Sequence, residues 1–344
     1  MAPVFDPEAP LAPNGNYFGF PYTENESPLV LVSVPWDVTT SYCPGAAKGP
    51  QAIRRASLQL DFFDFEIPDA YRLGIGTMDF ARAEKIAALS EELRPLAENV
   101  IEKGGMNAAQ DLAKVNAGSV SVNDWLYQTS SALLQQGKHV GVVGGDHSCP
   151  LGLLRALGER QGSFGILHFD AHADLRKAYE GFVFSHASIM YNALQLPQVE
   201  KLVQVGVRDV CQSEQDLVRD SNGRVRQFSD AMLHEMLYRG GNWSDICRQI
   251  IDSLPQKVYV SFDIDALQPA LCPHTGTPVP GGLEFAQVRF LLSLLRQSGK
   301  QIIGFDLCEV APDAENPADE WDGNVGARML YMLCNTLLAQ KARQ

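Results

Sequence analysis

Residues 165–174, Gly-Ile-Leu-His-Phe-Asp-Ala-His-Ala-Asp, join a short apolar run to three side chains that can bind metal ions. The apolar run favours a buried β-strand over residues 165–169. Asp170, His172 and Asp174 recur at every second position after it, so they leave the end of that strand on one side. The stretch therefore predicts a metal site at the carboxyl end of a buried strand.

Two other stretches place ligand-type residues after an apolar run. Asp263 and Asp265 follow residues 258–262, and His147 lies in Gly-Gly-Asp-His-Ser at 144–148, after the run 139–143. Each motif alone is more typical of a capped turn, a solvated loop or a core histidine. Six ligand candidates at three strand ends are too many for one ordinary ion. Together they predict a two-metal hydrolytic centre, in which ions about 3.5–4 Å apart share a hydroxide.

The chemistry of these six side chains also limits which metals fit. Carboxylates and neutral imidazoles suit Mn²⁺, Fe²⁺, Co²⁺, Ni²⁺ or Zn²⁺, and no cysteine stands among the candidates. Four carboxylates among the six favour Mn²⁺ within this group. We therefore expect two Mn²⁺ ions per chain.

Six short apolar runs alternate with helical patterns along the chain and predict the fold class. Such runs, separated by helices, are typical of an α/β fold in which a mainly parallel sheet is covered on both faces. Ligands bind such sheets at the carboxyl ends of the strands, where all six candidates lie. We expect residues 102–119 to form an irregular excursion or a short helix on the rim. The runs are 29–34, 139–143, 165–169, 202–207, 258–262 and 302–307, and the amphipathic segments include 122–136 and 283–298.

The chain is expected to divide into an arm and one domain. Residues 1–27 are rich in Pro, Gly, Asn and Glu, which predicts an extended N-terminal arm outside the core, either disordered or wrapped around a neighbouring subunit. Residues 28–344 are within the size range of a single catalytic domain.

Composition excludes several classes of partner. The formal net charge of −13 argues against nucleic acid and anionic membranes as partners. No apolar stretch reaches the length of a membrane span, and the first residues do not resemble a secretion signal. The seven cysteines are scattered and never spaced as Cys-x-x-Cys, which argues against a disulfide framework and favours a cytoplasmic location.

Three motifs resemble the signatures of the arginase/agmatinase (ureohydrolase) superfamily: Gly-Gly-Asp-His-Ser at 144–148, Asp-Ala-His-Ala-Asp at 170–174 and Ser-Phe-Asp-Ile-Asp at 261–265. The resemblance covers roughly residues 28–340, with further matching segments at 44–54, 206–209, 275–278, 282–283 and 305–310. It implies a three-layer α/β/α arginase-like fold, two Mn²⁺ ions and a homotrimer or homohexamer. It also implies that Asp170 and Asp263 bridge the ions, with His147 and Asp174 completing one site and His172 and Asp265 the other.

The same resemblance assigns three residues to catalysis and substrate binding. His186 matches a rim histidine that passes protons to the leaving amine, a role that suits the side chain titrating nearest neutral pH. Glu309 matches the carboxylate that pairs with the substrate guanidinium, and Thr277 matches a hydroxyl lining the pocket. The implied reaction is attack of a metal-bridging hydroxide on the guanidino carbon of a small substrate, which releases urea and an amine.

The sequence departs from arginases where they hold the α-amino acid part of arginine. Arg176 and Cys211 stand where arginases have an Asn and an Asp, so an agmatine-like or other guanidino compound fits better than L-arginine. Formimidoylglutamase remains an alternative, although such enzymes usually lack the Thr-Gly-Thr-Pro-x-x-Gly-Gly segment kept here at 275–282. A nickel-dependent guanidine hydrolase is a second alternative. Trp321 is predicted either to cap a small substrate or to pack in the core or an interface.

Two competitors come from other functional classes. Histone-deacetylase-like enzymes share part of the ligand pattern but bind one Zn²⁺, which the full set of six ligands argues against. A catalytically inactive arginase-like regulatory protein would have no need to keep all six ligands together with His186 and Glu309. A binuclear-metal ureohydrolase therefore remains the preferred hypothesis.

Overall fold

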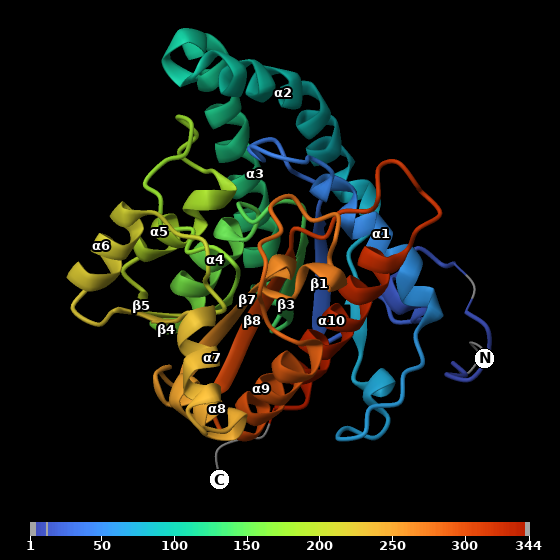
Figure 1. Cartoon of the computed structure of the whole chain (residues 1–344). Helices are drawn as coiled ribbons and strands as arrows, with labels where there is room; N and C mark the ends of the chain where they lie inside the picture. Colours follow the sequence, from blue (N-terminus) through green and yellow to red (C-terminus); the bar gives the residue numbers. More distant parts are fainter. Residues whose placement is uncertain (1–4, 12, 341–344) are drawn as a thin grey trace.

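One central sheet of eight parallel strands runs through the computed structural model, which describes residues 5–11 and 13–340 (Figure 1). Its strand order is β2-β1-β3-β8-β7-β4-β5-β6. All six predicted strands are present, and the short strands β2 and β6 were not predicted because three or four residues carry too little pattern. The strands are β1 Leu29–Val34, β2 Ile75–Thr77, β3 His139–Gly144, β4 Phe164–Phe169, β5 Val199–Val205, β6 Val225–Phe228, β7 Lys257–Asp263 and β8 Gln301–Cys308.

Helices cover both faces of this sheet, so the predicted three-layer α/β/α fold is confirmed (Figure 1). Successive strand residues alternate between two apolar clusters: Leu167 packs with α1 and α7 to α10, and Ile166 packs with α2 to α6. The helices are α1 Gly49–Ala56, α2 Glu84–Lys103, α3 Ala109–Gln135, α4 Leu151–Gln161, α5 Ile189–Leu194, α6 Gln212–Asp220, α7 Asp230–Tyr238, α8 Trp243–Asp252, α9 Phe285–Gln297 and α10 Trp321–Leu338.

The prediction for residues 102–119 is wrong. They form the end of α2, a short 3₁₀ turn and the first part of α3, a helix of 27 residues. Gly118 suggested a break in regular structure, but it lies inside α3 where a β-carbon would collide with Leu93 of α2. This glycine therefore allows the two helices to pack closely, which a single chain segment does not reveal.

The N-terminal segment also differs from its prediction as an arm outside the core. Tyr17, Phe18 and Phe20 are fully buried, and the ring centroid of Phe20 lies 4.9 Å from that of Phe62. The Tyr17 hydroxyl is 2.8 Å from Ser33 Oγ in β1. These aromatic residues belong to the core of their own chain. Residues 1–4 and 12 of the predicted arm, and 341–344 of the predicted domain, lie outside the described residues.

The sheet order brings the predicted site together. Strands β3, β8, β7 and β4 are consecutive neighbours, and because all are parallel, their carboxyl ends meet at one edge of the sheet. The last residue of β7, Asp263, and the segments that follow these four strands carry all six predicted metal ligands and Glu309. A parallel sheet thus gathers residues that are up to 162 positions apart in the chain.

Candidate metal centre

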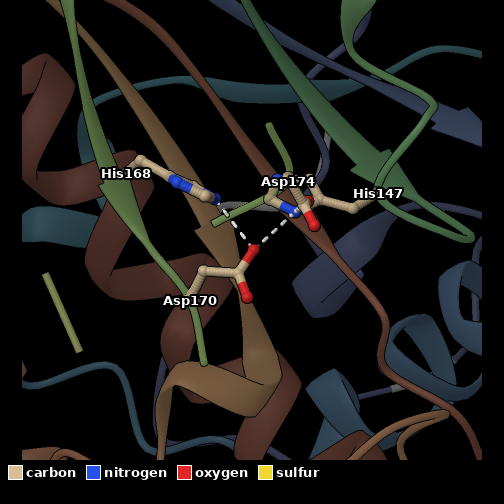
Figure 2. Close-up of side chains that lie close together, drawn as sticks. All are labelled: His147, His168, Asp170 and Asp174. Atoms are coloured by element: carbon tan, nitrogen blue, oxygen red, sulfur yellow. Dashed lines mark hydrogen bonds and ion pairs between the residues drawn. The ribbon is translucent and has the colours of Figure 1, made fainter. Parts of the chain in front are cut away.

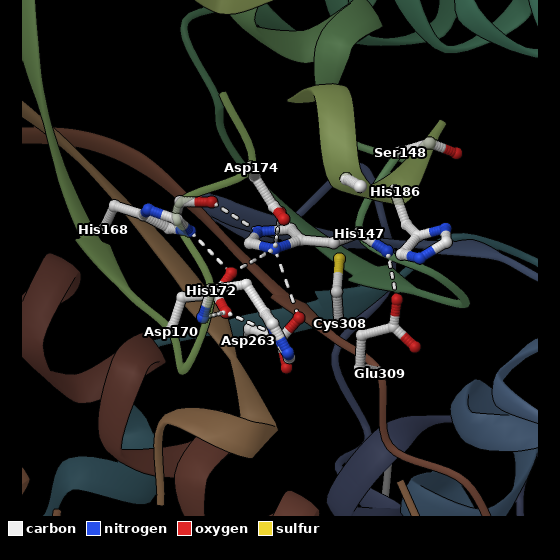
Figure 3. A network of polar contacts seen from close by, with 12 residues as sticks. His147, Ser148, His168, Asp170, His172, Asp174, His186, Asp263, Cys308 and Glu309 are labelled. Carbon is white, nitrogen blue, oxygen red and sulfur yellow. Dashed lines mark hydrogen bonds and ion pairs between the residues drawn. The ribbon is translucent and has the colours of Figure 1, made fainter. Parts of the chain in front are cut away.

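The six predicted ligands lie together around His147 and His172, and Figure 3 shows five of them. His172 is partly exposed and the other five are buried. His147 lies just beyond β3, and its Nδ1 atom faces three carboxylates at nearly equal distances. It is 3.1 Å from Asp170 Oδ2, 3.2 Å from Asp174 Oδ2 and 3.2 Å from Asp263 Oδ2. One nitrogen and three oxygens therefore converge on a single point, an arrangement suited to a cation.

A second group shares one carboxylate with the first. His172 Nδ1 is 3.3 Å from Asp170 Oδ1 and 3.0 Å from Asp265 Oδ2. Asp170 therefore directs one oxygen to each histidine, as a residue that bridges two ions would. Asp263 contacts the first group through Oδ2, while its Oδ1 accepts a hydrogen bond of 2.9 Å from the Asp265 N–H.

The electrostatics of this cluster also favour bound cations. Burial raises the pKa of the Asp263 carboxyl well above its ordinary value, and the charges of Asp265 and Asp170 add to the rise. Burial and the neighbouring Asp170 likewise raise the pKa of Asp174 to about 7. Without a cation, protons must reduce the mutual repulsion of these carboxylates. Divalent ions would displace those protons, so this nitrogen and oxygen donor set fits the metals that the sequence predicts.

His147 is oriented from behind by residues that the sequence analysis did not single out. Its Nε2 atom is 2.9 Å from Ser261 Oγ and 3.5 Å from Asp306 Oδ1. His168 is a third residue of this kind, but it contacts Asp170 and not His147: its Nε2 lies 2.8 Å from Asp170 Oδ2 (Figure 2). All three are polar residues inside otherwise apolar strands, and this interruption is the sequence feature that would have revealed them.

Glu309 lies beside the cluster and occupies an uncommon backbone conformation. Its φ is 64°, in the left-handed region that non-glycine residues adopt rarely and chiefly where surrounding contacts impose it. Those contacts are a 2.8 Å bond from the His147 N–H to Oε1 (Figure 3) and a 2.8 Å bond from the Thr275 hydroxyl to the Glu309 carbonyl. Burial, with Asp146 nearby, raises the pKa of Glu309 well above its usual range. Thr277 is half-buried, two residues from Thr275.

His186 is held at the edge of the cluster by its backbone. Its N–H donates to Thr39 Oγ1 at 3.2 Å, and the Thr39 hydroxyl donates to Asp146 at 3.0 Å. The ring of Tyr179 lies edge-on, with centroids 6.2 Å apart. Burial, reinforced by the positive charge of His172, lowers the pKa of His186 to about 4. Its imidazole is therefore neutral at physiological pH.

Comparison with known proteins identifies the family. The Arginase family model matches residues 27–334. The chain belongs to the arginase family. It is 33% identical over 295 residues to the N(1)-aminopropylagmatine ureohydrolase of Thermus thermophilus, with 86% of each chain covered. It is 30% identical over 308 residues to the agmatinase of Klebsiella pneumoniae, again with 86% of each covered.

A solved structure gives the same fold. The agmatine ureohydrolase of Thermoplasma volcanium superposes with a TM-score of 0.72 at 23% identity, covering 95% of each chain. The predicted resemblance to the arginase/agmatinase superfamily is thus confirmed, and this arginase-family member is a hydrolase acting on C–N bonds of linear amidines. Within residues 5–11 and 13–340, none of its helices is long and apolar enough to cross a membrane.

The positions predicted to disfavour arginine lie on loops around the cluster. The guanidinium of Arg176 is 4.9 Å from the centre of the Tyr179 ring. Cys211 caps the N-terminus of α6, where its N–H donates to Glu214 at 2.9 Å.

Trp321, the first residue of α10, is 47% exposed, and its indole N–H donates to the Ala270 carbonyl at 2.9 Å. Of the alternatives predicted for it, packing in the core of its own chain is therefore wrong.

Proposed function

We propose that this arginase-family hydrolase is a binuclear-metal amidinohydrolase that releases urea and an amine from a small guanidino compound. The observation that carries the proposal is Asp170, whose two oxygens face His147 on one side and His172 on the other. When bound, two divalent ions would lower the pKa of water and supply hydroxide at neutral pH. Mn²⁺ is the expected metal, and Ni²⁺ the alternative.

Six residues would hold this metal pair. Asp170 and Asp263 are proposed to bridge the ions, because both reach the first group and both lie beside a ligand of the second. The remaining ligands would be His147 and Asp174 for one ion, and His172 and Asp265 for the other.

Glu309 and His186 are proposed to bind and protonate the substrate. The buried Glu309 carboxylate uses Oε1 for the His147 N–H, which leaves Oε2 to accept from a guanidinium in a strong, charge-assisted bond. Neutral His186 can take a proton and pass it to the departing nitrogen, which leaves poorly as an unprotonated amide. Thr277 is proposed to line the pocket, near Thr275 and Glu309.

The substrate is proposed to be agmatine or a related guanidino compound without an α-amino acid group. Support comes from the relatives, whose names are agmatinase and N(1)-aminopropylagmatine ureohydrolase. Cys211 adds to it, since its thiol offers no negative partner for the α-ammonium of arginine. A homotrimer or homohexamer and a cytoplasmic location are further proposals, to be tested by light scattering and by cell fractionation.

Turnover of a substrate panel tests the proposed function. Purified protein loaded with Mn²⁺ or with Ni²⁺ is incubated with agmatine, guanidinobutyrate, guanidine, arginine and formiminoglutamate, and urea, ammonia and formamide are measured. Urea release from agmatine, lost in Asp170→Asn, supports the proposal. Formamide from formiminoglutamate alone would make the protein a formimidoylglutamase, and no turnover by metal-loaded protein would favour a regulatory role.

A further inference from the structure

A row of five polar side chains crosses the sheet directly beneath the metal centre. Gln227 in β6 is in register with Gln204 in β5, and Gln204 with His168 in β4. The row continues through Ser261 in β7 to Asp306 in β8. All five point to the face covered by α2 to α6, because the apolar residues next to them in each strand belong to the cluster on the opposite face. Polar residues in register across five strands of a buried sheet require an explanation.

The orientation of the Gln204 amide can be deduced from its neighbours. One of its terminal atoms lies 2.7 Å from the carbonyl oxygen of Ala173. A carbonyl oxygen can only accept, so this atom must be the NH₂ group, Nε2. The other terminal atom, Oε1, accepts a 2.8 Å bond from Gln227. Both ends of the amide are thus fixed.

The fixed amide determines which nitrogen of His168 carries the proton. Gln204 Nε2 is also 2.9 Å from His168 Nδ1, and since Nε2 donates, Nδ1 must be the unprotonated acceptor. The proton of the neutral ring is then on Nε2, which lies 2.8 Å from Asp170 Oδ2 (Figure 2). His168 therefore donates a hydrogen bond to the carboxylate that is proposed to bridge the two ions.

We propose that Gln204 is a positioning residue of the metal centre, acting through His168 on Asp170 and through the Ala173 carbonyl on the ligand loop. This inference rests on the proposed function. Ala173 lies between the proposed ligands His172 and Asp174, so one amide group fixes both the loop that carries them and the tautomer of His168. A neutral donor fixes the direction of the carboxylate without adding a positive charge that would oppose metal binding.

The choice of glutamine over glutamate follows from the same reasoning. Glutamate at position 204 would place an acceptor against the acceptor His168 Nδ1, so the hydrogen bond that orients the ring would be lost. It would also leave the Ala173 carbonyl without its donor. Gln204→Glu, which barely changes side-chain shape, therefore tests the proposed role more sharply than a truncation does.

Four variants test the inference through Mn²⁺ affinity, measured with a competing chelator and no substrate. We expect Gln204→Glu and His168→Phe to weaken Mn²⁺ binding by roughly 10–100-fold, the usual effect of losing a group that orients a metal ligand. His168→Gln keeps an N–H donor at a similar reach and should recover part of the affinity. Ser33→Ala is the matched control, because Ser33 is equally buried in the sheet and, among the described residues, its hydroxyl bonds Tyr17 and none of the proposed ligands.

Thermal unfolding of the metal-free variants separates positioning from general stability. The rise in Tm on adding Mn²⁺ should shrink in Gln204→Glu and His168→Phe, and stay at the wild-type value in Ser33→Ala. Unchanged Mn²⁺ affinity in both Gln204→Glu and His168→Phe would overturn the inference. If His168→Phe does not fold, Gln204→Glu alone decides. Wild-type protein that neither binds Mn²⁺ nor releases urea would instead refute the proposed function.

Discussion

Replacing Glu309 by glutamine should weaken the binding of guanidino substrates while leaving both metal ions in place. The side chain is 6% exposed, so its interaction with a cation is little screened by water. Glutamine keeps the Oε1 acceptor for the His147 N–H, a bond of 2.8 Å, and the metal ligand keeps its backbone support. At the other oxygen, however, an NH₂ group would face the N–H donors of the guanidinium.

The size of the effect follows from the loss of a charged acceptor. Hydrogen bonds to charged groups contribute about 1.5–3 kcal/mol, and a buried donor facing another donor costs about 1–3 kcal/mol. The two effects together cost at least about 2.5 kcal/mol, and a loss near 3 kcal/mol, at the low end of their sum, corresponds to roughly two decades in affinity. We therefore expect KM for agmatine to rise about 100-fold in Glu309→Gln, with kcat reduced less.

Steady-state kinetics together with elemental analysis of the same protein sample would measure this effect. Thr275→Val is a useful control, because it removes the 2.8 Å bond to the Glu309 carbonyl but keeps the carboxylate. It should change KM far less than Glu309→Gln does. An unchanged KM in Glu309→Gln, accompanied by loss of metal, would refute the assigned role and place Glu309 among the metal ligands.

Four further predictions follow from the site. Asp170→Ala should lose both ions and Asp174→Ala only one, because Asp170 faces both histidines; equal losses in elemental analysis would exclude the bridging role. Burial and Asp170 raise the pKa of Asp174 to about 7 in the folded chain, so the stability from its bound proton is complete below pH 4 and is lost as pH rises through 7. Chelator-treated protein should accordingly have a lower Tm at pH 8 than at pH 5, a difference that Mn²⁺ loading should remove. Replacing His186 by Phe should reduce kcat by about 10²–10⁴-fold with two ions still bound, and a change in KM alone would contradict proton transfer. Arginine should have a kcat/KM at least about tenfold below that of agmatine, since an unpaired α-ammonium costs about 1–3 kcal/mol.

The sequence was sufficient to predict the sheet and the ligand cluster because both depend on local pattern. Runs such as residues 165–169 and 258–262 are mostly apolar, and the strands β4 and β7 form there. Alternation then places Asp170, His172 and Asp174 on one side of a strand end. Parallel strands bring such ends to one edge of the sheet, so the cluster itself could be expected without knowing the strand order.

The features that were missed depend on contacts between distant segments. Residues 102–119 are rich in glycine and polar residues, yet Gly118 is required where α3 packs against Leu93. The N-terminal segment looks like an arm by composition, but Phe18 and Phe20 reach the aromatic cluster around Phe62. In both cases burial against another part of the chain outweighs local propensity.

The polar row beneath the metal centre shows the same dependence at the level of single side chains. In its own strand His168 is one polar residue among five apolar or small ones, and nothing in that strand says whether its ring binds metal or satisfies a core contact. The answer lies in Gln204, which is 36 positions away and becomes a lateral neighbour only because β5 pairs with β4. Since Gln204 fixes the ring as a donor to Asp170, His168 is assigned to orienting a ligand instead of serving as one. A polar residue that interrupts a buried strand two positions before a metal ligand is therefore best interpreted together with the residue in register on the next strand.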